Sequence, residues 1–121
     1  IRRRPNIETL NKMARVLHGE IDCTTFASSL DKSVSKFRYI ENAVFYPDGD
    51  YLVFEITANA FLWKMVRSLT GSLLEIEKKG YDENYFRQVL ESKNRKLAGF
   101  TAPPQGLFLW SVSYEGIRRH K

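Results

Sequence analysis

Residues 59–76 read Asn59-Ala-Phe-Leu-Trp-Lys-Met-Val-Arg-Ser-Leu-Thr-Gly-Ser-Leu-Leu-Glu-Ile76, which predicts an apolar helix entered directly from a strand. Apolar residues recur at helical spacing, at Leu62, Met65, Val66, Leu69, Leu73 and Ile76. We expect Asn59 to cap this helix, because its side-chain oxygen can accept from the first free backbone N–H groups. Arg67 lies within the apolar segment. Its side chain either snorkels to solvent or binds a carboxylate or phosphate with its planar fork.

The strand before this helix belongs to a predicted β-hairpin. Residues 37–46 are rich in aromatic and branched side chains, Pro47-Asp48-Gly49-Asp50 supplies a turn, and residues 51–58 return. Side chains of a strand alternate between its two faces, so one alternate set should face the helices. That set is Leu52, Phe54, Ile56 and Ala58.

Further helices and a last strand are predicted outside the hairpin and the central helix. One helix follows Asn6 and stops at Gly19, and a short turn then buries Phe26. The central helix ends around Gly80. Residues 107–114 read as a strand that is apolar on both faces. The third helix starts at Asp82 and is expected to bury Tyr85, Phe86, Val89 and Leu90.

This element order predicts an α+β fold in a single domain over residues 1–121, with an antiparallel sheet that carries helices on one face. No predicted helix is left to cover the second face of the sheet. We therefore expect another domain or another subunit to cover it.

Charge and composition narrow the classes of function. The chain has 19 Lys and Arg against 14 Asp and Glu, a net charge of +5 that favours an anionic partner such as nucleic acid. No apolar run reaches the roughly 18 residues that a membrane-spanning helix needs. Cys23 is the only cysteine, so no internal disulfide forms, and no His/Cys spacing is typical of a metal site. These features favour a reducing, cytoplasmic environment.

The sequence offers few groups for catalysis. It has no Ser/His/Asp set, no glycine-rich phosphate loop and no paired-carboxylate signature. His18 and His120 are interpreted as surface residues, and Cys23 as a small buried hydrophobe rather than a nucleophile. Arg67 is the one residue for which the pattern suggests a chemical role.

The run from Asn59 to Arg67, continued by Gly71-Ser-Leu-Leu-Glu75, closely resembles a motif of the TruA family of tRNA pseudouridine synthases. Leu17-His-Gly-Glu-Ile-Asp22-Cys-Thr-Thr-Phe26 is similar to that family's helix end and following turn, with Cys23 in place of an aromatic residue. Arg38 matches the arginine that opens the family's hairpin. Residues 98–109, with Gly106-Leu107-Phe-Leu, are similar to its closing strand.

The resemblance implies an isomerase that converts uridine to pseudouridine in the anticodon stem-loop of tRNA, as a homodimer and without metal or organic cofactor. It implies a catalytic role for Arg67, which would pair with the family's catalytic aspartate. Leu107 would line the substrate pocket, and Asn59 and Phe61 would help to shape the cleft. The second face of the sheet would then form part of this active-site cleft.

The sequence departs from the family pattern at its start. The Arg-Thr-Asp-x-Gly-Val-His-type segment that carries the aspartate is absent, as is the tyrosine-bearing strand, and the chain begins at Ile1. We therefore expect residues 1–121 to be the C-terminal domain of such an enzyme, inactive without its catalytic N-terminal domain. The alternatives are a non-catalytic RNA-binding module and a dimerisation domain.

Overall fold

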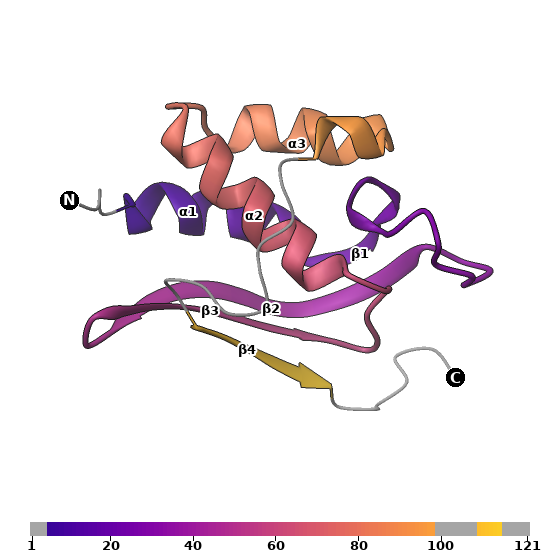
Figure 1. Ribbon diagram of the computed structural model, residues 1–121, viewed down its shortest axis with the longest axis horizontal. Coiled ribbons are helices and arrows are strands. Elements are labelled where there is room, and N and C mark those ends of the chain that lie inside the picture. Colours follow the sequence, from indigo (N-terminus) through magenta and orange to yellow (C-terminus); the bar gives the residue numbers. More distant parts are fainter. Residues whose placement is uncertain (1–4, 99–108, 115–121) are drawn as a thin grey trace.

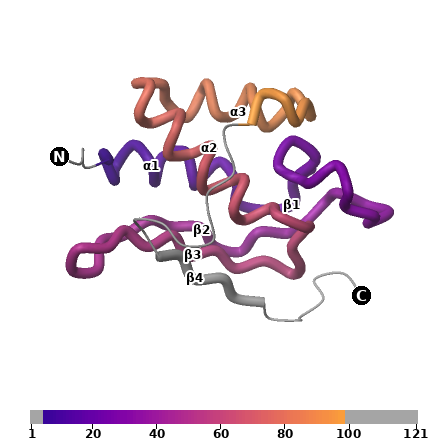
Figure 2. Tube along the Cα trace, viewed as in Figure 1, coloured from indigo at the N-terminus to yellow at the C-terminus, as the bar shows by residue number. Residues whose placement is uncertain are grey.

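The structure is a computed structural model that describes residues 5–98 and the backbone of residues 109–114. Figure 1 shows its helices and strands, and Figure 2 follows the same chain as a trace. Three short 3-10 turns, η1, η2 and η3, span Arg15–Leu17, Thr24–Phe26 and Arg95–Leu97. The main elements in chain order are α1 (Ile7–Ala14), β1 (Gly19–Asp22), β2 (Phe37–Asp48), β3 (Tyr51–Ala58), α2 (Met65–Lys78), α3 (Glu83–Ser92) and β4 (Leu109–Tyr114).

The four strands of the described residues form one sheet in the order β1-β2-β3-β4. β1 pairs with β2 and β2 with β3 in antiparallel fashion, whereas β4 lies parallel to β3. Helices α1, α2 and α3 lie on the same side of the sheet (Figure 1). The predicted α+β fold is thus confirmed, and the parallel pairing of β4 is the one departure from an antiparallel sheet.

The core lies between the sheet and the helices, where the sequence pattern placed it. On β3, Phe54, Ile56 and Ala58 are buried, and the ring of Phe54 stacks on that of Phe45 with centroids 4.4 Å apart. The apolar stripe of α2 packs into the same cluster through Met65, Leu69, Leu73 and Ile76. Burial of this stripe fixes α2 against the sheet and so determines where its first turn lies.

One asparagine caps helix α1, and a second one binds the helix to the sheet. The Asn6 side chain caps the helix by accepting from Thr9 N at 3.0 Å, as predicted. One turn further, Asn11 Nδ2 donates to Phe45 O at 2.9 Å, and Phe45 N donates to Asn11 Oδ1 at 2.7 Å. β1 pairs with residues 37–40 of β2 and does not extend as far as Phe45. The Asn11 side chain therefore supplies the hydrogen bonds that a neighbouring strand would otherwise make to Phe45.

Helix α2 ends as the sequence predicts but begins later. Gly80, with φ of 84°, follows its last turn, and two bonds close a Schellman motif: Gly80 N to Glu77 O at 3.0 Å and Tyr81 N to Ile76 O at 3.1 Å. The expectation that Asn59 caps α2 is wrong. The helix starts at Met65 after Lys64, whose φ of 63° is left-handed and whose side chain makes no capping bond.

The first helical segment ends before Gly19 and the short turn buries Phe26, as predicted. Strand β1 over residues 19–22 was not predicted, because it is defined by pairing with a distant segment, such as Ile21 with Arg38. One further local prediction is wrong. Tyr85 was expected in the core, but it is 37% exposed and stacks on Tyr81 at 4.5 Å between centroids. Within the described ranges, every helix is too short or too polar to cross a bilayer.

Candidate functional site

Two of the four predicted site residues lie on the connection between β3 and α2, and a third lies in the first turn of α2. Asn59 directly follows β3, Phe61 lies in the connection, and Arg67 is in the first turn of α2. Leu107 falls outside the residues that the structure describes. The described part of the site is therefore one continuous segment, held between the sheet and the central helix.

Asn59 is bound into the sheet through both its backbone and its side chain. Its backbone N–H donates to Tyr39 O at 3.1 Å, and its Oδ1 accepts from Tyr39 N at 3.0 Å. These bonds continue the β2–β3 pairing past Ala58, next to the register shift between Ile40 and Asn42. Asn59 thus fixes the direction in which the chain leaves the sheet.

Phe61 is partly buried and packs against the hydrophobic core. The next residue, Leu62, is fully inside that core, and its carbonyl accepts from Met65 N at 3.1 Å in the turn that leads into α2. The Phe61 side chain is therefore held partly by packing and remains partly exposed. Such a half-exposed aromatic group is suited to line a cleft.

Two basic side chains lie at the start of α2. Arg67 is partly buried in the first turn, beside the buried Val66 and Ser68, and Lys64 precedes the helix. The first turn contains no acidic residue, and no side chain caps it. The N-terminal end of a helix already carries partial positive charge, and these two cations add to it. The segment is therefore suited to receive an anionic group.

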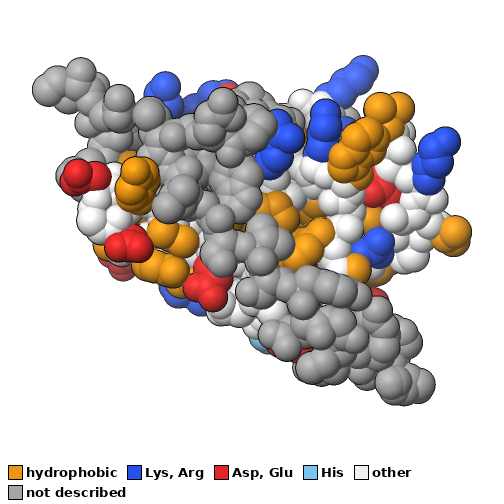
Figure 3. All heavy atoms as spheres, turned by 60° about the horizontal axis from the view of Figure 1, so that its bottom comes forward, with side chains coloured by type: hydrophobic (Ala, Val, Ile, Leu, Met, Phe, Trp, Pro, Cys, Tyr) orange, Lys and Arg blue, Asp and Glu red, His pale blue; other side chains and the backbone are white. Residues whose placement is uncertain are grey.

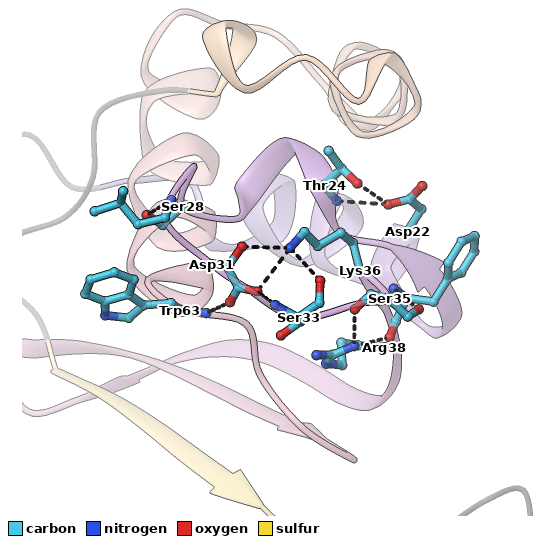
Figure 4. A network of polar contacts seen from close by, with 11 residues as sticks. Asp22, Thr24, Ser28, Asp31, Ser33, Ser35, Lys36, Arg38 and Trp63 are labelled. Carbon is cyan, nitrogen blue, oxygen red and sulfur yellow. Dashed lines mark hydrogen bonds and ion pairs between the residues drawn. The ribbon is translucent and has the colours of Figure 1, made fainter.

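A polar network attaches the loop between η2 and β2 to this segment. Asp31 Oδ2 accepts from the backbone N of Trp63 at 2.6 Å, and Trp63 O accepts from Ser28 N at 3.2 Å. Figure 4 shows Asp31 between Trp63 and Lys36, with the Trp63 ring pointing away from the network. The loop and the start of α2 are thus held together as one surface.

Asp31 is the centre of this network, and its side chain is only 6% exposed. Its Oδ1 accepts from Ser33 N at 2.8 Å and from Lys36 Nζ at 3.1 Å. The bond from the Trp63 backbone, followed by those from Ser33, holds the pKa of Asp31 well below its usual range. The carboxylate therefore stays ionised and bound at neutral pH. The sequence pattern gives no sign of the contact with Trp63, because the two residues lie 32 positions apart in the chain.

Arg38, at the start of β2, closes the other end of the same loop. Its Nη1 donates to Ser35 O at 2.9 Å and to Phe37 O at 2.6 Å. Its Nε is buried, and it is the one buried side-chain polar atom without a hydrogen bond among the residues that the structure describes. Arg38 therefore contributes to the shape of the loop through its carbonyl contacts.

Neither a cysteine nucleophile nor a metal site is supported among the residues that the structure describes. Burial raises the pKa of Cys23 to about 12, so this thiol is not a nucleophile at neutral pH, in agreement with the sequence interpretation. In residues 5–98, no three His, Cys, Asp or Glu side chains come together as a metal site would require. The electropositive segment around Arg67 remains the best candidate for function.

Comparison with known proteins decides the family. Residues 13–115 match the family model described as tRNA pseudouridine synthase. The chain belongs to the tRNA pseudouridine synthase family. It is 59% identical to tRNA pseudouridine synthase A of Treponema denticola over 94% of this chain and 42% of that protein. It is 50% identical to tRNA pseudouridine synthase A of Borreliella afzelii over 95% of this chain and 47% of that protein.

The chain thus spans less than half the length of these two synthases. A third relative, tRNA pseudouridine synthase A of Treponema pallidum, is 52% identical over 82% of this chain and 35% of its own length. The matched residues include the whole connection from β3 to α2. The resemblance inferred from that connection is confirmed at the level of the family.

Proposed function

We propose that this chain forms one wall of the active site of a tRNA pseudouridine synthase, an isomerase that converts uridine to pseudouridine in the anticodon stem-loop of tRNA. The family match and the names of the relatives support the reaction class. The observation that carries the proposal is the place of Arg67, partly buried in the first turn of α2 and within the residues that the family model matches.

In this proposal the chain is the C-terminal domain of the enzyme, and a catalytic N-terminal domain supplies the aspartate. The two domains would meet at the sheet face opposite the helices, and two copies would form a homodimer in the cytoplasm. The relatives are long enough to hold a second domain, since this chain accounts for 42% and 47% of two of them. The net charge of +5 suits a tRNA partner.

Arg67 would act on the aspartate electrostatically. A guanidinium beside a carboxylate favours the ionised form, which a nucleophilic carboxylate requires. The fork of Arg67 can also fix both carboxylate oxygens in one plane, which a lysine cannot do. Arg67 is in turn held by α2, whose apolar stripe is buried in the core. The carboxylate would therefore meet a cation whose position is set by the fold.

Three other residues would shape the pocket that receives the uridine. Phe61 offers a partly buried aromatic surface, and Leu107 would supply an apolar wall. Asn59 would act mainly through the backbone, because its Oδ1 is occupied by Tyr39 N. A uridine that leaves its loop needs such a pocket, together with basic surface for the phosphates.

The test is pseudouridine formation by the full-length protein on a tRNA transcript, detected by carbodiimide labelling of the modified base. We expect Arg67→Ala to lower turnover about a hundredfold or more, as loss of a preorganised charge contact does. Arg67→Lys should restore only part of the activity. Arg87→Ala removes an exposed arginine on α3 and should leave turnover unchanged.

Three results would contradict the proposal. Pseudouridine formed by residues 1–121 alone would show that the catalytic group lies within this chain. Loss of soluble protein in Arg67→Ala, with full activity in the remaining folded fraction, would make Arg67 a structural residue. A full-length protein that binds tRNA but forms no pseudouridine would favour the alternative, a non-catalytic RNA-binding module.

A further inference from the structure

An exposed aromatic side chain lies directly before α2, with apolar and basic neighbours. Trp63 is 53% exposed, and Lys64 Nζ lies 5.6 Å from the centroid of its ring. Leu30, 64% exposed, and the exposed Lys32 flank Asp31, whose carboxylate binds the Trp63 backbone. We call these four residues the Trp63 patch. Figure 3 shows Lys and Arg side chains between exposed hydrophobic ones at the right-hand end, where the η2–β2 loop lies in Figure 1.

The backbone beneath this patch is rigidly held. Trp63 N donates to Asp31 Oδ2 at 2.6 Å and Trp63 O accepts from Ser28 N at 3.2 Å, so both of its backbone polar groups are engaged. Lys64 adopts a left-handed conformation with φ of 63°, which costs a non-glycine residue about 1–2 kcal/mol. Such backbone strain is typical of functional positions. The fold thus presents the indole to solvent in a fixed place.

The charge around the indole favours a polyanion. Lys64 lies over the ring, and Lys32 is exposed on the neighbouring loop. The one carboxylate of that loop, Asp31, is already bonded to Trp63 N, Ser33 N and Lys36. An RNA strand offers a flat base for the ring and phosphates for the lysines at the spacing of one nucleotide.

We propose that Trp63 is a stacking platform for an unpaired base of the RNA substrate, with Lys64 and Lys32 binding the neighbouring phosphates. The inference rests on the proposed function, because it assigns a substrate contact to the same protein. Trp63 is four residues before Arg67, on the connection that leads from the sheet to the site. The stacked base would lie beside the target uridine and hold the strand while that uridine enters the pocket.

The test measures the affinity of the full-length protein for an anticodon stem-loop RNA by fluorescence anisotropy over a range of salt concentrations. Trp63→Ala keeps both backbone bonds and removes only the ring, so we expect normal folding and about tenfold weaker binding. Trp63→Phe should recover much of the affinity. Tyr81→Ala, which removes another aromatic residue of similar exposure, 48%, is the matched control and should bind as the wild type does.

Loss of a lysine should change the salt dependence of RNA binding, which loss of the Trp63 ring should not. Lys64→Asn removes the charge with a residue that tolerates the left-handed conformation. It should reduce the slope of log affinity against log salt by about one, as loss of one phosphate contact does, whereas Trp63→Ala should leave the slope unchanged.

Equal affinity for Trp63→Ala, Tyr81→Ala and the wild type would overturn the inference. A changed molar mass of Trp63→Ala in light scattering, with intact RNA affinity, would also overturn it and assign the patch to a subunit contact. If the wild type forms pseudouridine in either case, the proposed function stands without the patch. If the wild type forms none, the proposed function fails, while the affinity series still decides whether the patch binds RNA.

Discussion

Asn59 and Tyr39 are joined by two hydrogen bonds, one from each backbone N–H, and one of these ends on the Asn59 side chain. This pair closes the β2–β3 ladder at the point from which the chain runs toward Arg67. A residue assigned to the substrate cleft is thus also part of the sheet.

Replacement of Asn59 should show how much its side-chain bond stabilises the sheet. We expect Asn59→Ala to lower the free energy of unfolding by about 1–2 kcal/mol, because Tyr39 N loses its acceptor. Asn59→Asp keeps an acceptor at the same place and should lose less. Urea unfolding of both variants checks this, and equal losses would mean that the side-chain bond contributes nothing to stability.

Asp31 should make stability depend on pH in the acid range. Its pKa in the folded protein lies below the unfolded value of about 3.9, chiefly through the Trp63 backbone bond. The contribution is therefore complete above about pH 4 and is lost as the pH falls toward the folded pKa. We expect Asp31→Asn to be less stable than the wild type at pH 7.

The difference between wild type and Asp31→Asn should then shrink as the pH is lowered below 4. Thermal unfolding at a series of pH values measures it. The control is Asp50→Asn, which changes an exposed carboxylate in the β2–β3 turn. Asp82 is unsuitable as a control because it caps α3. A constant difference at all pH values would contradict the role assigned to the Asp31 charge.

Asn11 should contribute more to stability than its place on a short helix suggests. Asn11→Ala removes two bonds and leaves both polar groups of Phe45 without their partner, so we expect a loss of about 2 kcal/mol. Asn84→Ala is the control, because Asn84 is exposed on α3 and alanine favours a helix. Denaturant unfolding would contradict the assignment if the two variants were equally stable.

Cys23 should be unreactive while the protein is folded. Its thiol is buried with a pKa of about 12, so very little thiolate exists at pH 8. We expect iodoacetamide to label Cys23 only after unfolding in denaturant, as followed by mass spectrometry. Rapid labelling of the native protein would show that this part of the core opens.

Most of the core could be predicted because its signals are local. The stripe of α2 and the alternation along β3 each repeat within one element, and the stop at Gly80 depends only on nearby residues. Segments defined by distant partners were missed. β1 exists because residues 37–40 pair with it, and Asn59 left its expected capping role because Tyr39 lies beside it.

Less of the candidate site could be predicted from the sequence than of the core. Spacing identified Arg67 as unusual but could not choose between solvent and an anion, and only the family resemblance assigned it a partner. Neither the residue spacing nor the family resemblance indicated the contact between Asp31 and Trp63, which are 32 positions apart in the chain. Lys64 was read as one more helical residue, since a left-handed conformation leaves no mark in the pattern of a lysine.

The parallel pairing of β4 sets an order of events during folding. β1, β2 and β3 are joined by loops and a tight turn, whereas α2 and α3 separate β3 from β4 in the chain. Contacts between distant segments form late, because closing a long stretch of chain costs entropy. The outer edge of β3 therefore stays open until the last strand arrives. During that interval its free backbone groups can pair with another molecule, and this is the step at which we expect the chain to be most prone to aggregate.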